Sequence, residues 1–306
     1  MAAAQSAMEY LITYGWAVLI IAVVLAVLFQ LGFFSSASIG PKLPPGGCTV
    51  QRSANPMAEI ISLEGVCSGL DPEYVASFGP SVSYQVIVGK EFFQDQSFTI
   101  LGWMYWPANV VGSNYDEDIG YAWSGDNDIV DEGFGIFVRS NPTYGVTNPY
   151  CEDGTPCWYL NFYSDDLECE SGPLPGHWYQ FGASWNAVTM QQTIWVDGQA
   201  ACNRTSTGDL MTNSVLYIGS AQNTWNTGAF MNGWLSNVQL YNVSLPQNDV
   251  SQLYAEGIGG PPLVLQNLVL WLPLNGNPTD YSGLNVTTTA ENVIGNGVWD
   301  PTYAPT

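Results

Sequence analysis

The sequence predicts a mainly β protein with a long hydrophobic helix at its N-terminus, and three features of the chain support this fold class. Residues 10–34 form an uncharged, mostly apolar run that is long enough to cross a bilayer as a helix. Residues 35–47 are rich in Ser, Pro and Gly, a composition typical of linkers. Beyond them, short alternating runs are separated by Gly, Asn, Asp and Pro, which is typical of an all-β sandwich.

The sandwich is predicted to contain strands at the clearest alternating segments, which are residues 97–106, 133–139, 157–163, 178–185, 193–196 and 215–219. Asp197 and Gly198 predict a tight hairpin turn between two strands. A further strand spans residues 233–241, with Trp234 or Leu235 beginning the set that faces the core. Residues 245–256, which open on Pro246, predict one short helix.

The charge of the chain excludes several classes of partner. The 306 residues include 27 acidic and 5 basic side chains, giving a formal net charge of −22. The basic residues are scattered at Lys42, Arg52, Lys90, Arg139 and Arg204. Because phosphate binding needs clustered Lys and Arg, we expect no nucleic acid partner and no attraction to an anionic membrane surface.

Cysteines and sequons indicate an exported protein. The six cysteines contain no CxxC pair and the chain has one histidine, so disulfides in an oxidising compartment are favoured over a zinc site. Many pairings are possible, and the favoured set joins Cys48 to Cys67, Cys151 to Cys157 and Cys169 to Cys202. Three sequons, at Asn203, Asn242 and Asn285, fit a glycosylated surface protein.

The N-terminal segment, AAAQSAMEYLITYGWAVLIIAVV, places Glu9 directly against the apolar run, where an unpaired carboxylate is costly in lipid. The segment resembles the class III signal and helix of archaeal type IV pilins. The resemblance implies a leader at residues 1–4, cleavage between Ala4 and Gln5, and a helix at residues 5–34. It also implies that Glu9 neutralises the new α-amine of a neighbouring subunit. Identical subunits would then associate through this helix, which sits in the membrane before assembly.

The exposed part of the chain carries a second resemblance. The stretches HWYQFGASWNAVTMQQTIWVDGQAA, at residues 177–201, and LYIGSAQNTWNTGAF onward, at residues 216–257, are similar to concanavalin A-like, laminin-G-like jelly rolls. Residues 268–283 resemble the segment that normally opens such a domain, and residues 74–98 resemble what normally follows it. We therefore expect one circularly permuted jelly-roll sandwich over residues 48–306.

Residues that carry chemistry are sparse. A retaining glycosidase needs two carboxylates on one strand face, and the nearest string, residues 166–170, reads as a loop. The single histidine, His177, is expected in the core and therefore not as a catalytic base. With no catalytic arrangement of either kind in the sequence, we expect no enzyme. We also expect no required cofactor. The acidic stretch at residues 115–132 leaves two interpretations open, a solvated loop or a calcium site. The candidate ligands are Asp116, Asp118, Asp126, Asp128 and Asp131. Trp123, Trp225 and Tyr144 are candidates for stacking on sugar rings.

The leading interpretation is therefore a structural subunit of an archaeal type IV pilus-like surface filament, whose outer sandwich serves adhesion or glycan binding. The alternative is a monomeric, membrane-anchored surface lectin or adhesin. Both place the protein at the cell surface.

Overall fold

A computed structural model gives the structure of the chain. It describes residues 18–24, 48–53, 61–64, 71–78, 84–91, 93, 96–107, 117–123, 133–139, 156–162, 165–210, 215–221, 229–292 and 299–300. The chain divides into two compact units, Met1–Leu43 and Pro44–Thr306.

In the first unit, residues 18–24 are helical and belong to the predicted N-terminal helix. Their large apolar side chains are more than half exposed in most cases, as in Val18 at 59% and Ile21 at 59%. Of the helices in the described part of the chain, none has the length and hydrophobicity that a membrane crossing requires. The leader, Glu9 and the remainder of the helix at residues 5–34 lie outside the described residues and stay predictions.

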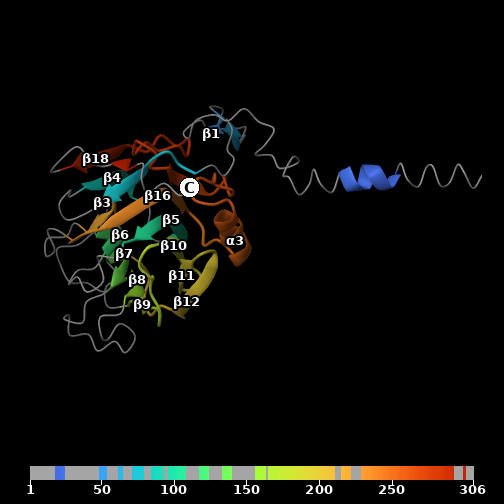
Figure 1. Ribbon diagram of the computed structural model, residues 1–306. Helices are drawn as coiled ribbons and strands as arrows, with labels where there is room; N and C mark the ends of the chain where they lie inside the picture. Colours follow the sequence, from blue (N-terminus) through green and yellow to red (C-terminus); the bar gives the residue numbers. More distant parts are fainter. Residues whose placement is uncertain are drawn as a thin grey trace, which may run out of the picture. The chain divides into compact units, whose positions relative to one another are not determined.

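The second unit is a two-sheet β-sandwich (Figure 1). The strands of the eight-stranded sheet, in spatial order, are β12 (Gln199–Thr205), β11 (Gln191–Val196), β10 (His177–Asn186), β5 (Phe98–Trp106), β16 (Gly233–Tyr241), β3 (Val75–Phe78) and β19 (Trp299–Asp300). Its eighth strand, β17 (Leu268–Leu272), also pairs with β16. Every pairing between strands in this sheet is antiparallel.

The second sheet has seven strands, in the order β18 (Thr288–Asn292), β4 (Tyr84–Glu91), β13 (Val215–Ile218), β6 (Glu117–Trp123), β7 (Gly133–Arg139), β8 (Cys157–Asn161) and β9 (Leu167–Glu168). Two small ribbons complete the described strands, β1 (Thr49–Arg52) with β2 (Ile61–Glu64), and β14 (Ser220–Ala221) with β15 (Ala229–Phe230). The predicted sandwich and the approximate positions of its strands are therefore confirmed.

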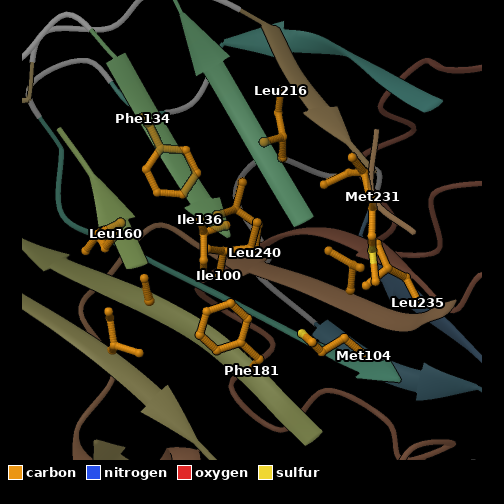
Figure 2. Packing of buried hydrophobic residues seen from close by; sticks show 14 of the residues in the cluster. Ile100, Met104, Phe134, Ile136, Leu160, Phe181, Leu216, Met231, Leu235 and Leu240 are labelled. Atoms are coloured by element: carbon orange, nitrogen blue, oxygen red, sulfur yellow. The ribbon is translucent and has the colours of Figure 1, made fainter. Parts of the chain in front are cut away.

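The main core lies between the two sheets because strand side chains alternate between faces. In β5, Phe98, Ile100, Met104 and Trp106 join this core. Figure 2 shows Ile100, Met104, Phe181, Leu235 and Leu240 of the eight-stranded sheet packed against Phe134, Ile136, Leu160 and Leu216 of the seven-stranded sheet. Between the two candidates in β16, Leu235 is the residue that faces the core and is fully buried.

The outer face of the eight-stranded sheet is partly covered by the predicted helix, α3 (Gln247–Ala255), which follows Pro246. A second apolar cluster forms there from Leu101 and Trp195 of the sheet, Val250 and Leu253 of α3, and Trp271 of β17. This second cluster occupies one part of the outer face only. It does not include residues at the end of β5 or at the starts of β10 and β16.

The C-terminal segment is an integral part of the sandwich, as the sequence predicted. β17 pairs with the second half of β16, while β3 pairs with its first half. β18 pairs with β4, and β19 pairs with β3. The guanidinium of Arg52 in β1 donates to the carbonyl oxygens of Leu265, Leu268 and Ser282, and so ties the start of this unit to the same segment.

Candidate functional site

Three aromatic residues form a row on the outer face of the eight-stranded sheet. Tyr105 of β5 lies directly opposite Trp178 of β10 on one side and opposite Trp234 of β16 on the other. We call these three residues the aromatic row. The ring centroids of Tyr105 and Trp178 are 5.7 Å apart, and those of Tyr105 and Trp234 are 5.2 Å apart. Both contacts are edge-to-face, with interplanar angles of 62° and 74°.

The alternation of strand side chains explains why these aromatic residues point away from the core. Met104 and Trp106 flank Tyr105 in sequence and are fully buried between the sheets, so Tyr105 faces outward. Leu235 is buried in the same way, which turns Trp234 outward. All three members of the aromatic row are partly exposed. Large aromatic side chains left at the surface of a sheet are candidates for contact with a partner.

The next position along the sheet marks the boundary with α3. Trp103 of β5 lies opposite Gln180 of β10 and Ser236 of β16. Its ring stacks on that of Tyr254 from α3, with centroids 5.6 Å apart and an interplanar angle of 16°. Trp103 thus connects the helix-covered part of the face to the partly exposed aromatic row.

Two polar side chains near the aromatic row, Asp197 and Gln180, carry hydrogen-bond acceptors. An oxygen of Asp197 accepts the backbone N–H of Gln180 at 3.0 Å. Burial raises the pKa of the Asp197 carboxyl, and this hydrogen bond opposes the rise. Gln180 is only 3% exposed, and its Oε1 has no hydrogen-bond partner among the residues that the structure describes. A buried acceptor without a donor carries a desolvation cost in the folded chain.

An exposed loop borders the aromatic row at residues 174–177. Leu174 is 66% exposed, and its N–H donates to the Tyr179 hydroxyl at 2.9 Å. Gly176 has a φ of +83° and its N–H donates to the carbonyl of Trp106 at 2.6 Å, so this turn requires glycine. His177 begins β10 and is exposed. The expectation that His177 lies in the core is therefore wrong, because its strand position precedes the part of β10 that packs between the sheets.

The segment at residues 166–170 also differs from its prediction as a loop, since Leu167–Glu168 form strand β9. Leu167 joins the core, so Asp166 and Glu168 flank it on the opposite face. The Asp166 carboxylate accepts the Tyr159 hydroxyl at 2.5 Å and the Phe162 N–H at 3.1 Å, whereas Glu168 lies 3.7 Å from Arg139. Burial raises the pKa of Asp166, and both hydrogen bonds oppose the rise. Both carboxylates therefore already serve internal contacts.

Other predicted site residues fall mostly outside what the structure describes. Asp116, Asp126, Asp128 and Asp131 lie there, and so does the side chain of Asp118 in β6, so the calcium prediction stays open. The proposed stacking residues Tyr144 and Trp225, and the side chain of Trp123, lie there as well. Among the residues with described placement, no three His, Cys, Asp or Glu side chains gather as a metal site would require.

The structure describes some of the predicted disulfide cysteines and all three sequon asparagines. A disulfide joins Cys169 to Cys202, the predicted pairing. Cys48 and Cys157 are also disulfide-bonded, and their predicted partners, Cys67 and Cys151, lie outside the described residues. The three sequon asparagines, Asn203, Asn242 and Asn285, are all exposed.

Sequence reasoning did not single out the aromatic row. Each of its residues lies in a predicted strand, and alternation with Met104 or Leu235 could have placed Tyr105 and Trp234 on the outer face. Which residues lie opposite one another depends on strand register, and the sequence contains no direct signal for the register between β10, β5 and β16.

A family model described as the concanavalin A-like lectin/glucanases superfamily (Laminin_G_3) matches residues 81–251. No functionally curated protein matches the chain in sequence. Among solved structures, a proposed carbohydrate-binding protein from Bacteroides ovatus is 16% identical, with 78% of this chain and 65% of that chain covered and a TM-score of 0.47.

A heptameric SAP-like pentraxin from Limulus polyphemus is 12% identical, with 82% and 94% covered and a TM-score of 0.46. The enzymatically active domain of tailspike protein 2 from bacteriophage CBA120 is 11% identical, with 79% and 35% covered and a TM-score of 0.48. This chain thus spans less than two thirds of the Bacteroides and bacteriophage structures. Likeness at this level does not transfer a ligand from one protein to another.

Proposed function

Because this chain belongs to the concanavalin A-like lectin/glucanase superfamily, we propose that its β-sandwich binds glycans and serves adhesion at the cell surface. The observation that carries the proposal is the aromatic row, in which Trp178, Tyr105 and Trp234 lie side by side and partly exposed on one sheet. Aromatic rings offer a broad apolar contact area with little loss of side-chain freedom. The apolar faces of sugar rings suit such a surface.

The proposed activity is binding rather than catalysis. The two carboxylates that flank Leu167, Asp166 and Glu168, resemble the arrangement that a glycosidase needs, but each is engaged by a neighbouring side chain. An attacking or proton-donating carboxyl group must be able to reach the substrate. We therefore propose no enzymatic role, and no cofactor beyond the calcium that the acidic stretch at residues 115–132 could hold.

We propose further that the N-terminal segment displays this sandwich as a subunit of an archaeal type IV pilus-like filament. The support comes from the sequence, in which Glu9 adjoins the apolar run and cleavage before Gln5 would create a partner amine. Identical subunits would associate through their helices, which sit in the membrane before assembly. The alternative is a monomeric lectin or adhesin that its helix anchors to the membrane.

The glycan-binding proposal is tested on the full-length protein, solubilised in detergent, against an array of surface glycans. Trp178→Leu removes the aromatic ring but keeps an apolar side chain, and Trp178→Phe keeps an aromatic ring as the matched control. We expect binding to fall about tenfold in Trp178→Leu and to persist in Trp178→Phe. If the wild type and both Trp178 variants bind the array equally, the aromatic row is not the glycan-binding site and the proposal as stated is wrong.

The filament proposal is tested by the N-terminal mass of the protein recovered from sheared native surface material. A chain that begins at Gln5 and occurs in filaments supports the pilin assignment. Retention of Met1, or recovery in the membrane fraction alone, would replace it with the anchored adhesin. Glu9→Gln should then separate processing from assembly, because it keeps the cleavage site and removes the carboxylate.

A further inference from the structure

We infer that the aromatic row selects uncharged, hydroxyl-rich glycans and holds a chain of linked sugar rings that runs across the strands. This inference rests on the proposed glycan binding and names the ligand class and its direction on the sheet. It follows from three properties of the same surface: the charges around it, the hydrogen-bonding groups beside it and the spacing of its rings.

The charges of the protein disfavour acidic glycans. The net charge is −22, so the protein repels anions at long range. Each of the three arginines is engaged by groups away from the aromatic row. Arg52 donates to backbone carbonyls of the C-terminal segment, Arg139 pairs with Glu168, and Arg204 pairs with Asp165. Recognition of a sugar carboxylate or sulfate normally depends on such guanidinium groups.

The hydrogen-bonding groups favour a ligand that donates. Gln180 follows Trp178 by two residues on β10 and therefore lies on the same face of the sheet. Its Oε1 is buried and lacks a donor within the described structure, whereas the neighbouring Asp197 carboxylate is only partly buried and accepts the Gln180 N–H. Sugar hydroxyls can donate to the Asp197 carboxylate. A carboxylate or sulfate on the sugar accepts only and would be left opposite other acceptors.

The spacing of the rings sets the direction and minimum length of the ligand. Trp178, Tyr105 and Trp234 lie on three adjacent strands, so the row crosses two interstrand spacings, or about 10 Å. A single sugar ring contacts only part of this row, whereas two or three linked rings cover it. Binding should therefore strengthen from mono- to trisaccharide and change little with further length.

The experiment uses the full-length protein with three matched pairs of probes: oligomers of glucose, mannose and galactose, each beside its C6-oxidised uronate oligomer. Affinities are measured by calorimetry from one to five rings, at low and high salt. We expect at least one neutral series to bind, its uronate counterpart to bind about tenfold more weakly or not at all, and Trp178→Leu but not Trp178→Phe to lose the neutral binding. Neutral binding should not depend on salt.

The outcomes distinguish this inference from the proposal beneath it. If a uronate series binds as tightly as its neutral partner, or more tightly, the selection for uncharged glycans is wrong while glycan binding stands. Equal affinity for one ring and three rings would overturn the direction across the strands. If no member of the panel binds, both the inference and the proposed function fail. Unchanged far-ultraviolet circular dichroism of the two Trp178 variants excludes misfolding as the cause of a loss.

Discussion

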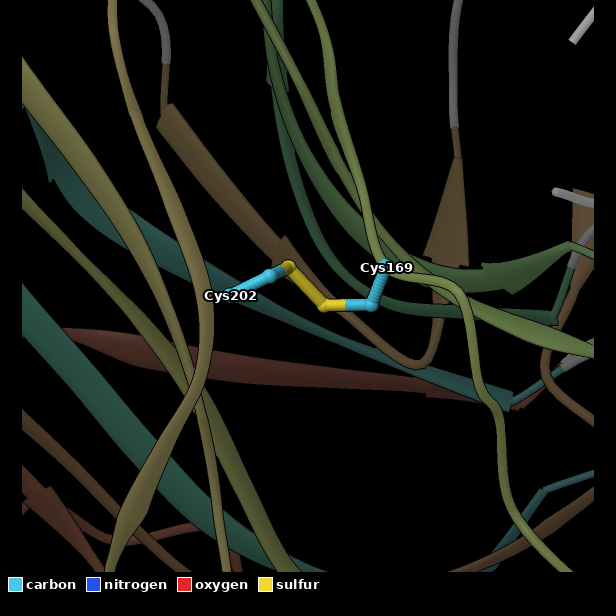
Figure 3. The surroundings of a disulfide bond; sticks show 2 residues. All are labelled: Cys169 and Cys202. Carbon is cyan, nitrogen blue, oxygen red and sulfur yellow. A yellow bond between two sulfur atoms is a disulfide. The ribbon is translucent and has the colours of Figure 1, made fainter.

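The disulfide between Cys169 and Cys202 joins the edges of the two sheets (Figure 3). Cys169 directly follows β9, the last strand of the seven-stranded sheet, and Cys202 lies in β12, the last strand of the eight-stranded sheet. The ion pair of Arg204 with the buried Asp165 connects the same two edges. One open side of the sandwich is thus closed by a covalent bond and a polar network.

Removal of this disulfide should destabilise the sandwich. Cys169 and Cys202 are 33 residues apart, and a loop of this length corresponds to roughly 3–4 kcal/mol of stabilisation in the chain-entropy model. We expect Cys169→Ala/Cys202→Ala to lower the free energy of unfolding by about this amount in urea denaturation. A loss below about 1 kcal/mol would show that the polar network alone keeps the two edges together.

The stability of this edge should depend on pH through Asp165. Burial acts to raise the pKa of Asp165, but hydrogen bonds from Ser206 and Thr207 and the charge of Arg204 outweigh it and hold the pKa below its usual value. The carboxylate therefore stabilises the fold above its unfolded pKa of about 4, and this contribution disappears as the pH falls through the folded pKa.

Asp165→Asn should accordingly be less stable than the wild type at pH 7, by about 1–3 kcal/mol, and the difference should shrink below about pH 4. Denaturation curves recorded between about pH 2 and about pH 7 measure this difference in stability. Asp209→Asn serves as control because Asp209 is exposed nearby. A difference that stays constant over this range would contradict a titrating role for Asp165.

Gly198 should resist substitution for two separable reasons. Its φ is +75°, and a Cβ at this position would meet the Cβ of Tyr254 at 2.8 Å. Gly257 has a similar φ of +80° with open space around it, so Gly257→Ala measures the backbone strain alone. We expect Gly257→Ala to cost about 1–2 kcal/mol in free energy of unfolding and Gly198→Ala clearly more.

The added Tyr254→Ala change should relieve only part of the excess cost of Gly198→Ala, because it removes the Tyr254 Cγ at 3.1 Å and Cδ1 at 3.2 Å but keeps the Cβ at 2.8 Å. A double-mutant cycle measures this part. Tyr254→Ala also removes the ring that stacks on Trp103, so its own cost must be subtracted in the cycle. If the effects of Gly198→Ala and Tyr254→Ala on the free energy of unfolding are additive, α3 moves away from residue 198 at no cost. The contact between the two residues then contributes no coupling energy.

The C-terminal segment should be necessary for folding. Leu270 of β17 is fully buried in the main core, and the paired strand β16 depends on β17 along its second half. Leu270→Ala should cost about 2–5 kcal/mol in chemical denaturation. Leu263→Ala, at a position that is 36% exposed, should cost much less. A chain truncated after Gly260 that unfolds with the cooperativity of the full chain would overturn the single, permuted sandwich.

The sequence by itself determined the local elements of this protein. Alternation predicted strands close to β5, β7, β10 and β11, since the pattern depends only on which side chains must avoid water. Asp197 and Gly198 predicted the hairpin turn, and both residues have positive φ as such a turn requires. The charge balance and the apolar run near Glu9 likewise follow from composition alone and do not depend on tertiary contacts.

Only the tertiary structure decided which of these elements meet. Trp178, Tyr105 and Trp234 are far apart in the chain and become one aromatic row through the register of three strands. The same holds for Cys169 and Cys202, whose pairing requires two sheets to close on each other. Strand register is set by the summed packing of both faces and by long-range loop closure, so no local pattern in the sequence specifies it.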